Sequence, residues 1–314
     1  MNRELRAGVV GVGHLGRHHA RLYSSMPGVR LVGVVDTNPE QAAAIAAQFG
    51  ASVFESAAGL ASQVDLASVA TPTESHLEAA LPLLDAGVPV LVEKPIAPDE
   101  QVARKLIERA ADRGAALMIG HTERFHPAVS ALLERLQRPR FIEIHRLAPF
   151  VPRSLDVDVV LDLMIHDLDL SRVLLGGEEV VMLDASGTPA LTEKIDLASV
   201  RLRFAQGAAA NLTASRISAV RMRRIRVFER GAYFACDTGA GTLEVNRIVT
   251  TTSGGREVVR EQVVVPKDEP LGCELAAFVT AVRERSPVPC TGEDGLAALK
   301  LARRIVAQIE RDPG

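Results

Sequence analysis

The segment VVLDLMIHDLDL, residues 159–170, combines an apolar composition with three carboxylates and one histidine. On an α-helix Asp162, His166 and Asp169 fall on one face, because positions i, i+4 and i+7 nearly align at 3.6 residues per turn. Leu, Met and Ile side chains cover most of the remaining surface. The pattern predicts a mostly buried helix, from about residue 158 to about residue 175, with one narrow polar stripe.

This polar stripe has three interpretations. It can be a structural cluster of ion pairs and caps, because buried charges are costly unless they are paired. It can be a metal site, since Asp-x3-His-x2-Asp places three ligands on one helical face, but no Cys or His cluster elsewhere supplies further ligands, and we expect no metal. It can also be an acid/base pair in which Asp162 orients His166, since imidazole ordinarily has a pKa of about 6.5.

A second candidate site lies near the start of the chain. An apolar run is followed by Gly11, Gly13 and Gly16 in the pattern Gly-x-Gly-x-x-Gly, with His14 and Leu15 inside it, and by a helix. The first glycine allows a tight turn, the second lets a pyrophosphate approach the backbone, and the third lets helix and strand pack closely. The helix N-terminus then offers N–H groups to the phosphates. This pattern predicts a dinucleotide-binding loop.

The second predicted strand, VRLVGVVD, indicates which dinucleotide binds. It ends at Asp36, where a carboxylate can accept hydrogen bonds from both ribose hydroxyls and would repel a 2′-phosphate. The alternative is that Asp36 only caps the next helix, NPEQAAAIAAQF. The ribose interpretation predicts NAD, rather than NADP, as the cofactor.

Strand–helix alternation continues to residue 120. Predicted strands lie in VDLASVATP (64–72), VPVLVEKP (88–95) and ALMIG (116–120), each after a helix-like segment. Such alternation is typical of an α/β domain with a parallel, doubly wound sheet of the Rossmann type, in which ligands bind beyond the carboxyl ends of the strands. Several further residues follow the carboxyl ends of these strands and are predicted to contact the cofactor: Thr71, Pro72, His76, Glu93 and Lys94. Of these, Lys94 is expected to point to the place of a nicotinamide.

The pattern changes after residue 120. RFHPAVSALLERL reads as a linking helix, and several runs between residues 180 and 265 alternate with period two between glycine-containing turns. We therefore expect a Rossmann domain over 1–120 and an α+β domain, built on a mostly antiparallel sheet, over 121–314. The sequence leaves open whether the final helix, residues 293–311, packs back on the first domain.

Bulk composition narrows the class of protein further. The net charge is −3, apolar residues make up 47% of 314 residues, and no run of about 18 apolar residues exists. These properties argue against nucleic-acid partners and against a membrane span. The N-terminus MNRELRAGVV has no signal-peptide pattern, and three scattered cysteines suggest free thiols in a reducing compartment. We expect a soluble cytoplasmic protein.

Taken in order, several motifs resemble those of the glucose–fructose oxidoreductase / inositol dehydrogenase (Gfo/Idh/MocA) family. They are GVGHLG (11–16), ATPTESH (70–76), VEKP (92–95), GHTERFHP (120–127), DLMIHDLD (162–169) and TGEDGLAAL (291–299). The resemblance implies NAD or NADP as cofactor and oxidation of a sugar or cyclitol. The family's catalytic lysine falls on Lys94, and its Asp-x3-His pair falls on Asp162 and His166. Which of Lys94 and His166 accepts the proton remains open.

One departure from the family pattern is Met164, where many members have glycine. GHTERFHP and DVDVVLDLMIHDLDL resemble instead the branch that acts on nucleotide sugars, in particular the UDP-N-acetylglucosamine 3-dehydrogenases. A nucleotide sugar needs cations for its diphosphate, and Arg124, Arg146 and Arg216 are candidates, with structural ion pairs as the alternative.

The alternative functions are a dehydrogenase of a free sugar or of inositol, and an NAD(H)-sensing protein without turnover. The retention of all three family catalytic positions argues against the sensing protein. The resemblance also implies a homodimer or homotetramer formed through the exposed face of the second sheet.

Overall fold

The computed structural model describes residues 3–151, 157–252 and 254–311. The chain divides into two compact units. The first contains Met1–Thr122 and Leu271–Leu299, and the second contains Glu123–Pro270 and Lys300–Gly314.

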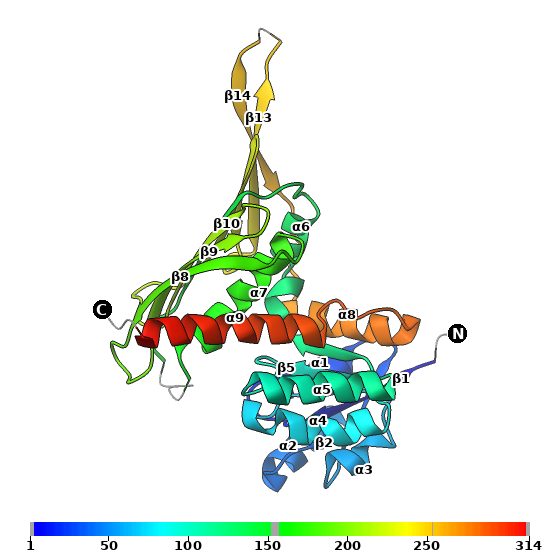
Figure 1. Cartoon of the computed structure of the whole chain (residues 1–314). Coiled ribbons are helices and arrows are strands. Elements are labelled where there is room, and N and C mark those ends of the chain that lie inside the picture. The colour runs from blue at the N-terminus through cyan, green and yellow to red at the C-terminus, as the bar shows by residue number, and fades with distance from the viewer. Residues whose placement is uncertain (1–2, 152–156, 253, 312–314) are drawn as a thin grey trace. The chain divides into compact units, whose positions relative to one another are not determined.

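The first unit contains a six-stranded, fully parallel sheet in the order β3-β2-β1-β4-β5-β6. This order reverses between β1 and β4, which is the topology of a Rossmann sheet. Its strands are β1 (Leu5–Val10), β2 (Val29–Val35), β3 (Ser52–Val53), β4 (Leu66–Val69), β5 (Val90–Glu93) and β6 (Leu117–Gly120). Its helices are α1 (Gly16–Ser25), α2 (Pro39–Phe49), α3 (Ala57–Ala61), η1 (Thr73–Ser75), α4 (His76–Asp85), α5 (Glu100–Arg113) and α8 (Pro270–Glu284) (Figure 1).

Local sequence explains where several of these helices start and stop. Asn38 caps α2 with its side-chain oxygen, and Asp99 caps α5 in the same way. Gly50 and Gly114 end the same two helices in the left-handed conformation that glycine adopts without strain. The strands β4 and β5, and also the edge strand β6, are buried along their whole length, as expected for a parallel sheet covered on both faces.

The first unit is completed by residues from the end of the chain. Ile119 donates its backbone N–H to the carbonyl of Cys290 at 3.0 Å, and a Cβ on Gly295 would lie 2.8 Å from Ile119 Cγ1. The sequence pattern assigned residues 271–299 to the second domain. In the structure they belong to the first unit, where Thr291, just before the start of α9 (Gly292–Arg311), pairs with Met118 of β6 in an isolated bridge.

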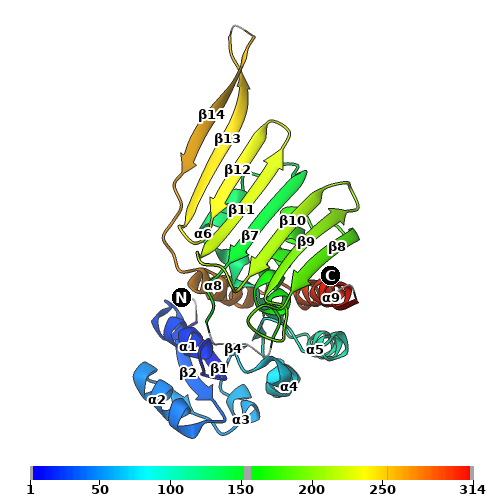
Figure 2. The ribbon, with the colours of Figure 1, turned by 90° about the vertical axis from the view of Figure 1, so that its left-hand side faces the viewer.

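The second unit contains an eight-stranded sheet in the order β14-β13-β12-β11-β7-β10-β9-β8, which can be followed in Figure 2. All neighbouring pairs are antiparallel except β7 and β10, which are parallel. The strands are β7 (Phe141–Leu147), β8 (Val180–Thr188), β9 (Leu197–Phe204), β10 (Ala209–Ser215), β11 (Met222–Glu229), β12 (Ala232–Asp237), β13 (Thr242–Thr250) and β14 (Arg256–Val263). The predicted fold class, a Rossmann domain followed by a mostly antiparallel α+β domain, is confirmed.

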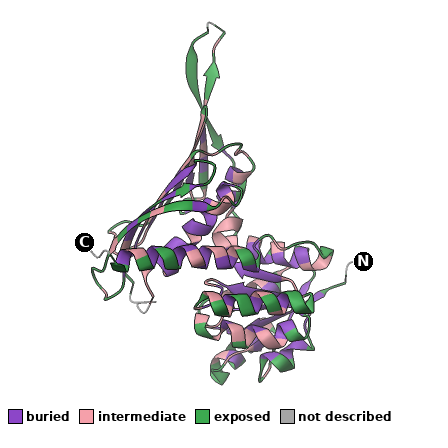
Figure 3. Ribbon diagram, viewed as in Figure 1, coloured by how far each residue is buried: buried purple, intermediate pink, exposed green. Residues whose placement is uncertain are grey.

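Helices cover one face of this second sheet. They are α6 (Pro127–Leu133), the π-helical turn η3 (Val160–Met164) and α7 (Ile165–Leu174), and the short 3-10 helix η2 (Thr122–Phe125) precedes them. Side chains of β9 alternate between buried and exposed positions, because one side of the sheet packs under these helices while the other faces outward. Figure 3 shows the outer part of the β13–β14 ribbon as exposed.

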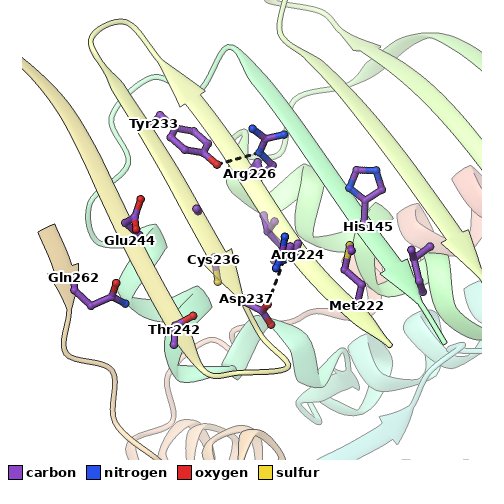
Figure 4. A pocket seen from close by; sticks show the side chains of 13 residues that line it. His145, Met222, Arg224, Arg226, Tyr233, Cys236, Asp237, Thr242, Glu244 and Gln262 are labelled. Atoms are coloured by element: carbon purple, nitrogen blue, oxygen red, sulfur yellow. Dashed lines mark hydrogen bonds and ion pairs between the residues drawn. The ribbon is translucent and has the colours of Figure 1, made fainter. Parts of the chain in front are cut away.

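The outward face of the second sheet is hollowed into a shallow depression of about 760 Å³. Figure 4 shows Arg226 and Tyr233 on its wall, with a hydrogen bond of 3.0 Å between them. Beside them the rings of Phe141, Phe228 and Tyr233 form a half-buried stack. The depression contains none of the residues predicted to do chemistry, and a half-exposed aromatic group on a flat sheet is typical of a protein–protein interface.

We expect this face to pair with a second copy of the chain. Phe228→Glu is then expected to shift the protein from a dimer or tetramer to a monomer, because a carboxylate would be buried without a partner in the interface. Light scattering during size-exclusion chromatography measures the mass directly. A monomeric unsubstituted protein at working concentration would contradict the prediction, and Glu284→Leu, an exposed position on α8, serves as a control.

Candidate functional site

The glycine-rich loop lies between β1 and α1. Gly11 adopts φ of +82° and donates its N–H to the carbonyl of Val35 at 2.8 Å. A Cβ on Gly16 would lie 1.7 Å from the carbonyl oxygen of Gly11, so only glycine permits this approach of helix to strand. His14 and Leu15, between them, are exposed. The first and third glycines thus fulfil their predicted roles in shaping the loop.

Gly13 differs from its two neighbours because it faces open space. A Cβ there would meet only the side-chain amide of Gln41, at 3.9 Å. Among the described residues no side chain caps the N-terminus of α1. A loop with room above its second glycine and an uncapped helix behind it fits a bound pyrophosphate.

Gly13→Val is expected to leave the fold intact and to weaken NAD binding at least about tenfold, because the valine occupies the space of the pyrophosphate. Titration calorimetry measures the dissociation constant, and thermal unfolding monitors the fold. Unchanged NAD binding would show that the pyrophosphate lies elsewhere. Gly59→Ala, on the short helix α3 and at an exposed position with room for a Cβ, is a control.

Asp36 follows β2 directly, and its carboxylate is held from three sides. Oδ2 accepts the N–H of Val12 at 2.7 Å and the amide of Gln41 at 3.1 Å, and Oδ1 accepts the N–H of Asn38 at 2.8 Å. The alternative role as cap of α2 belongs instead to Asn38, whose side chain accepts from the N–H groups of Glu40 and Gln41. Asp36 is therefore a fixed carboxylate beside the glycine loop, which suits a ribose diol.

We expect the protein to prefer NAD over NADP, and Asp36→Ala to reduce that preference at least about tenfold, since two charge-assisted hydrogen bonds to the ribose would be lost. Dissociation constants for both dinucleotides test this. Asp36→Asn keeps the shape of the side chain and separates the effect of charge from that of the lost contacts to Val12. Comparable affinity of the unsubstituted protein for NADP would refute the prediction.

The remaining predicted cofactor residues gather after β4 and β5. The hydroxyl of Thr71 is buried and makes no hydrogen bond to a described residue. His76 is buried, and its ring nitrogens lie 3.0 Å from the carbonyl of Thr71 and 3.3 Å from that of Ile96. Burial lowers the pKa of His76. His76 therefore ties the two loops together, while Pro72 is exposed at the start of η1.

Lys94 follows the last residue of β5, Glu93, as predicted. Lys94 is half-buried, whereas Glu93 is buried, and the peptide bond between Lys94 and Pro95 is cis. The Glu93 carboxylate accepts the backbone N–H of Lys94 at 3.2 Å. These contacts place an ammonium group at the carboxyl edge of the parallel sheet, the edge at which ligands of such sheets bind.

In the second unit, the polar helix of residues 160–174 begins with a π-helical turn, in which Ile165 donates to the carbonyl of Val160. Single π turns are frequent at functional sites. Asp162 lies in this turn and His166 in the first turn of α7, and both are half-buried. Asp167 and Asp169 are buried almost completely. Of these four side chains, only those of Asp162 and His166 are thus partly exposed.

The two buried aspartates bind arginines. Arg124 donates its Nε to Asp169 at 2.6 Å. Arg146 donates its Nε to Asp167 at 2.9 Å and its Nη1 to Glu123 at 2.9 Å. Burial opposes the charge of Arg146, but Asp167 and Glu123 raise its pKa. The residues of the polar stripe therefore differ in role. Asp169 forms a buried ion pair with Arg124, a role that the sequence pattern does not distinguish from that of Asp162.

The third candidate arginine is also buried and paired. Arg216 lies 3.4 Å from Asp196 and donates to the carbonyl of Val157. All three predicted diphosphate ligands therefore bind carboxylates of their own unit, which is the structural alternative kept open above. Asp167 and Asp196, the main acceptors, were not identified from the sequence, because their partners are distant along the chain.

Two further observations concern metal ligands and helix hydropathy. Within residues 3–151, 157–252 and 254–311, no group of three or more His, Cys, Asp or Glu side chains could hold a metal ion. Over the same residues, no helix has both the length and the apolar character needed to cross a membrane.

Comparison with known proteins identifies the family. Residues 5–121 match the family model described as "Oxidoreductase family, NAD-binding Rossmann fold", and residues 136–233 match the "GFO/IDH/MocA C-terminal domain". The chain is similar to the UDP-N-acetylglucosamine 3-dehydrogenase of Acidithiobacillus ferrooxidans, with 41% identity over 98% of this chain and 97% of the relative. It is also similar to an inositol 2-dehydrogenase of Rhizobium meliloti, with 30% identity over 97% of each chain.

Solved structures agree with this comparison. A structure of the UDP-N-acetylglucosamine 3-dehydrogenase of Acidithiobacillus ferrooxidans has a TM-score of 0.92 at 40% identity and covers 98% of each chain. The resemblance found from the ordered motifs is confirmed over both units, and the chain belongs to the GFO/IDH/MocA family of NAD-binding oxidoreductases.

Proposed function

We propose that this protein oxidises the 3-hydroxyl of UDP-N-acetylglucosamine to a ketone with NAD as hydride acceptor. The observation that carries the proposal is the 41% identity, over nearly the whole of both chains, to an enzyme of that name. Lys94, Asp162 and His166 provide the polar groups that such a reaction needs. The fixed carboxylate of Asp36 supports NAD as the dinucleotide.

In this proposal the bound nicotinamide would accept the hydride, and protein side chains accept the proton of the sugar hydroxyl. His166 or Lys94 accepts the proton of the hydroxyl group, and Asp162, four positions before His166, orients its imidazole. As an ammonium, Lys94 donates a hydrogen bond to the same oxygen and stabilises its developing negative charge. The three free cysteines suit the reducing cytoplasm in which we propose that the reaction takes place.

The test compares three substrates in the presence of NAD: UDP-N-acetylglucosamine, free N-acetylglucosamine and myo-inositol. NADH absorbance is expected only with the UDP-sugar. Since a keto product accumulates poorly when oxidation is unfavourable, parallel reactions contain an aminotransferase and its amino donor, which together convert the ketone to an amine without consuming NADH.

Two other outcomes decide between the remaining functions. NADH formation with inositol and none with the UDP-sugar would favour the inositol dehydrogenase function, which the 30% identical relative supports. Tight NADH binding without oxidation of any sugar would favour an NAD(H)-sensing protein.

A further inference from the structure

A buried polar cluster lies inside the first unit, behind Lys94. His19 on α1, Glu93 at the end of β5 and Glu274 on α8 contribute the ionisable groups, and all three are buried. These elements are otherwise packed with apolar side chains such as Leu275 and Phe278. Burying ionisable groups in such surroundings is costly unless they are paired, and the cofactor contacts described above give no role to the side chains of His19 and Glu274.

Glu93 is the centre of this buried cluster. Its Oε1 lies 2.9 Å from Nε2 of His19, and its Oε2 accepts the backbone N–H of Lys94 at 3.2 Å. Burial favours the neutral acid, but the hydrogen bond from His19 and the charge of Lys94 lower the pKa of Glu93 below its ordinary value. The other ionisable groups that act on Glu93 are His76 on α4 and Glu274 on α8.

Gly120 on β6 makes room for the Glu93 carboxylate. A Cβ at this position would lie 3.0 Å from Oε2 of Glu93 and 3.2 Å from its Cα. The carboxylate is therefore confined on one side by His19 and on the other by the backbone of β6. Neither oxygen can turn away without losing the contact to His19 or to the amide of Lys94.

Glu274 closes the cluster from the end of the chain. Its Oε2 accepts the hydroxyl of Thr122 at 3.0 Å, and its Oε1 is buried with no hydrogen bond to a described residue. Burial and the negative charge of Glu93 raise the pKa of Glu274 well above its ordinary value. Both effects favour the neutral form of the Glu274 carboxyl group, which lies in the same buried cluster as Glu93.

We propose that His19 and Glu274 are positioning residues of the oxidoreductase: together they hold Glu93 as the anion that fixes Lys94 at the carboxyl edge of the sheet. His19 supplies the hydrogen bond that holds the carboxylate, and Glu274, held by the hydroxyl of Thr122, is the second buried acid of the cluster. Both residues act through Glu93, and Glu93 acts on Lys94 through its backbone N–H and through its charge.

The first measurement needs no substrate. Competitive acetylation by acetic anhydride, followed by mass spectrometry from about pH 7 to about pH 11, reports when the amine of Lys94 becomes nucleophilic, with the exposed Lys105 as internal reference. His19→Leu and Glu93→Gln are expected to move the midpoint for Lys94 to lower pH by at least about half a unit, because the ammonium loses the anion beside it. His19→Gln, whose amide can reach as far as Nε2, is expected to restore most of the difference.

The second measurement, turnover of UDP-N-acetylglucosamine, rests on the proposed function. His19→Leu and Glu274→Leu are expected to lower kcat about tenfold or more while KM for both substrates changes less than about threefold. Glu274→Gln imitates a neutral acid and is expected to retain most of kcat. Glu284→Leu, at an exposed position of the same helix, is the matched control.

Gly120→Ala keeps the proposal testable if a leucine variant fails to fold, because it displaces the Glu93 carboxylate while leaving His19 and Glu274 in place. It must shift acetylation of Lys94 in the same direction as Glu93→Gln. Folded Gly120→Ala and His19→Leu proteins that acetylate like the control would overturn the proposal. A shift in acetylation without turnover of any sugar would support the positioning cluster and count against the proposed substrate alone.

Discussion

Lys94→Ala is expected to lower kcat by about a hundredfold or more while NAD still binds, because the side chain acts on the reacting oxygen rather than on the dinucleotide phosphates. Stopped-flow and steady-state measurements with the UDP-sugar give kcat, and calorimetry gives the dissociation constant for NAD. Lys105→Ala, an exposed lysine of α5, is the control. Near-normal turnover would remove Lys94 from the mechanism.

His166→Ala is expected to cause a loss of similar size in kcat, with the fold retained, because alanine at this half-buried helical position has a high helix propensity. Asp162→Asn should reduce kcat less, because it orients the imidazole without taking the proton. A larger loss in Asp162→Asn than in His166→Ala would assign the proton to the carboxylate instead.

Arg146→Ala is expected to destabilise the protein by about 3 to 5 kcal/mol, because it leaves the carboxylates of Asp167 and Glu123 buried without their shared cation. The Arg146 and Asp167 side chains are 6% and 1% exposed, so solvent screens their interaction little. Urea unfolding measures the change in free energy. Arg113→Ala is the matched control: this guanidinium pairs with Asp85 at 3.2 Å but is 49% exposed, and its loss should cost no more than about 1 kcal/mol.

This prediction separates the two roles proposed for Arg146. If the arginine only holds the second unit together, stability falls and KM for the UDP-sugar in the remaining folded protein is unchanged. Unchanged stability with a raised KM would show instead that Arg146 binds the diphosphate. Arg216→Ala, beside Asp196, should behave in the same way as Arg146→Ala.

The sequence predicts most of the architecture, because the spacing of apolar residues within a segment shows which of its side chains are buried. The glycine spacing and the apolar run before it define β1 and the loop, and the period-two runs define β8 to β14. The spacing of apolar residues does not show which other element packs against the buried face of a helix or strand. The apolar side of residues 271–284 had to be covered, but nothing in its spacing indicated that it packs in the first unit.

The candidate site is predictable to a different degree in each unit. Asp36 and Lys94 follow strands, and the ends of parallel strands share one edge, so topology alone groups them. In the second unit, the carboxylates of the polar helix differ in role only because some of them contact residues that are distant in the sequence. Asp169 shares a face with Asp162 on an ideal helix, yet Arg124, 45 positions earlier, makes it structural. The spacing of apolar and polar residues likewise does not predict the π-helical turn before α7.

The first unit cannot be completed until late in synthesis, because residues 271–299, which belong to it, follow the second sheet in the sequence. When the first 270 residues have been synthesised, every strand of both described sheets exists, but α8 and α9 do not. Ile119 still lacks the carbonyl of Cys290, and Thr122 still lacks Glu274. Apolar surface beside β6 therefore stays in water until residues 271–299 have been synthesised, and exposed apolar surface makes partly folded chains prone to aggregation. Truncated proteins that end before residue 271 should accordingly be insoluble.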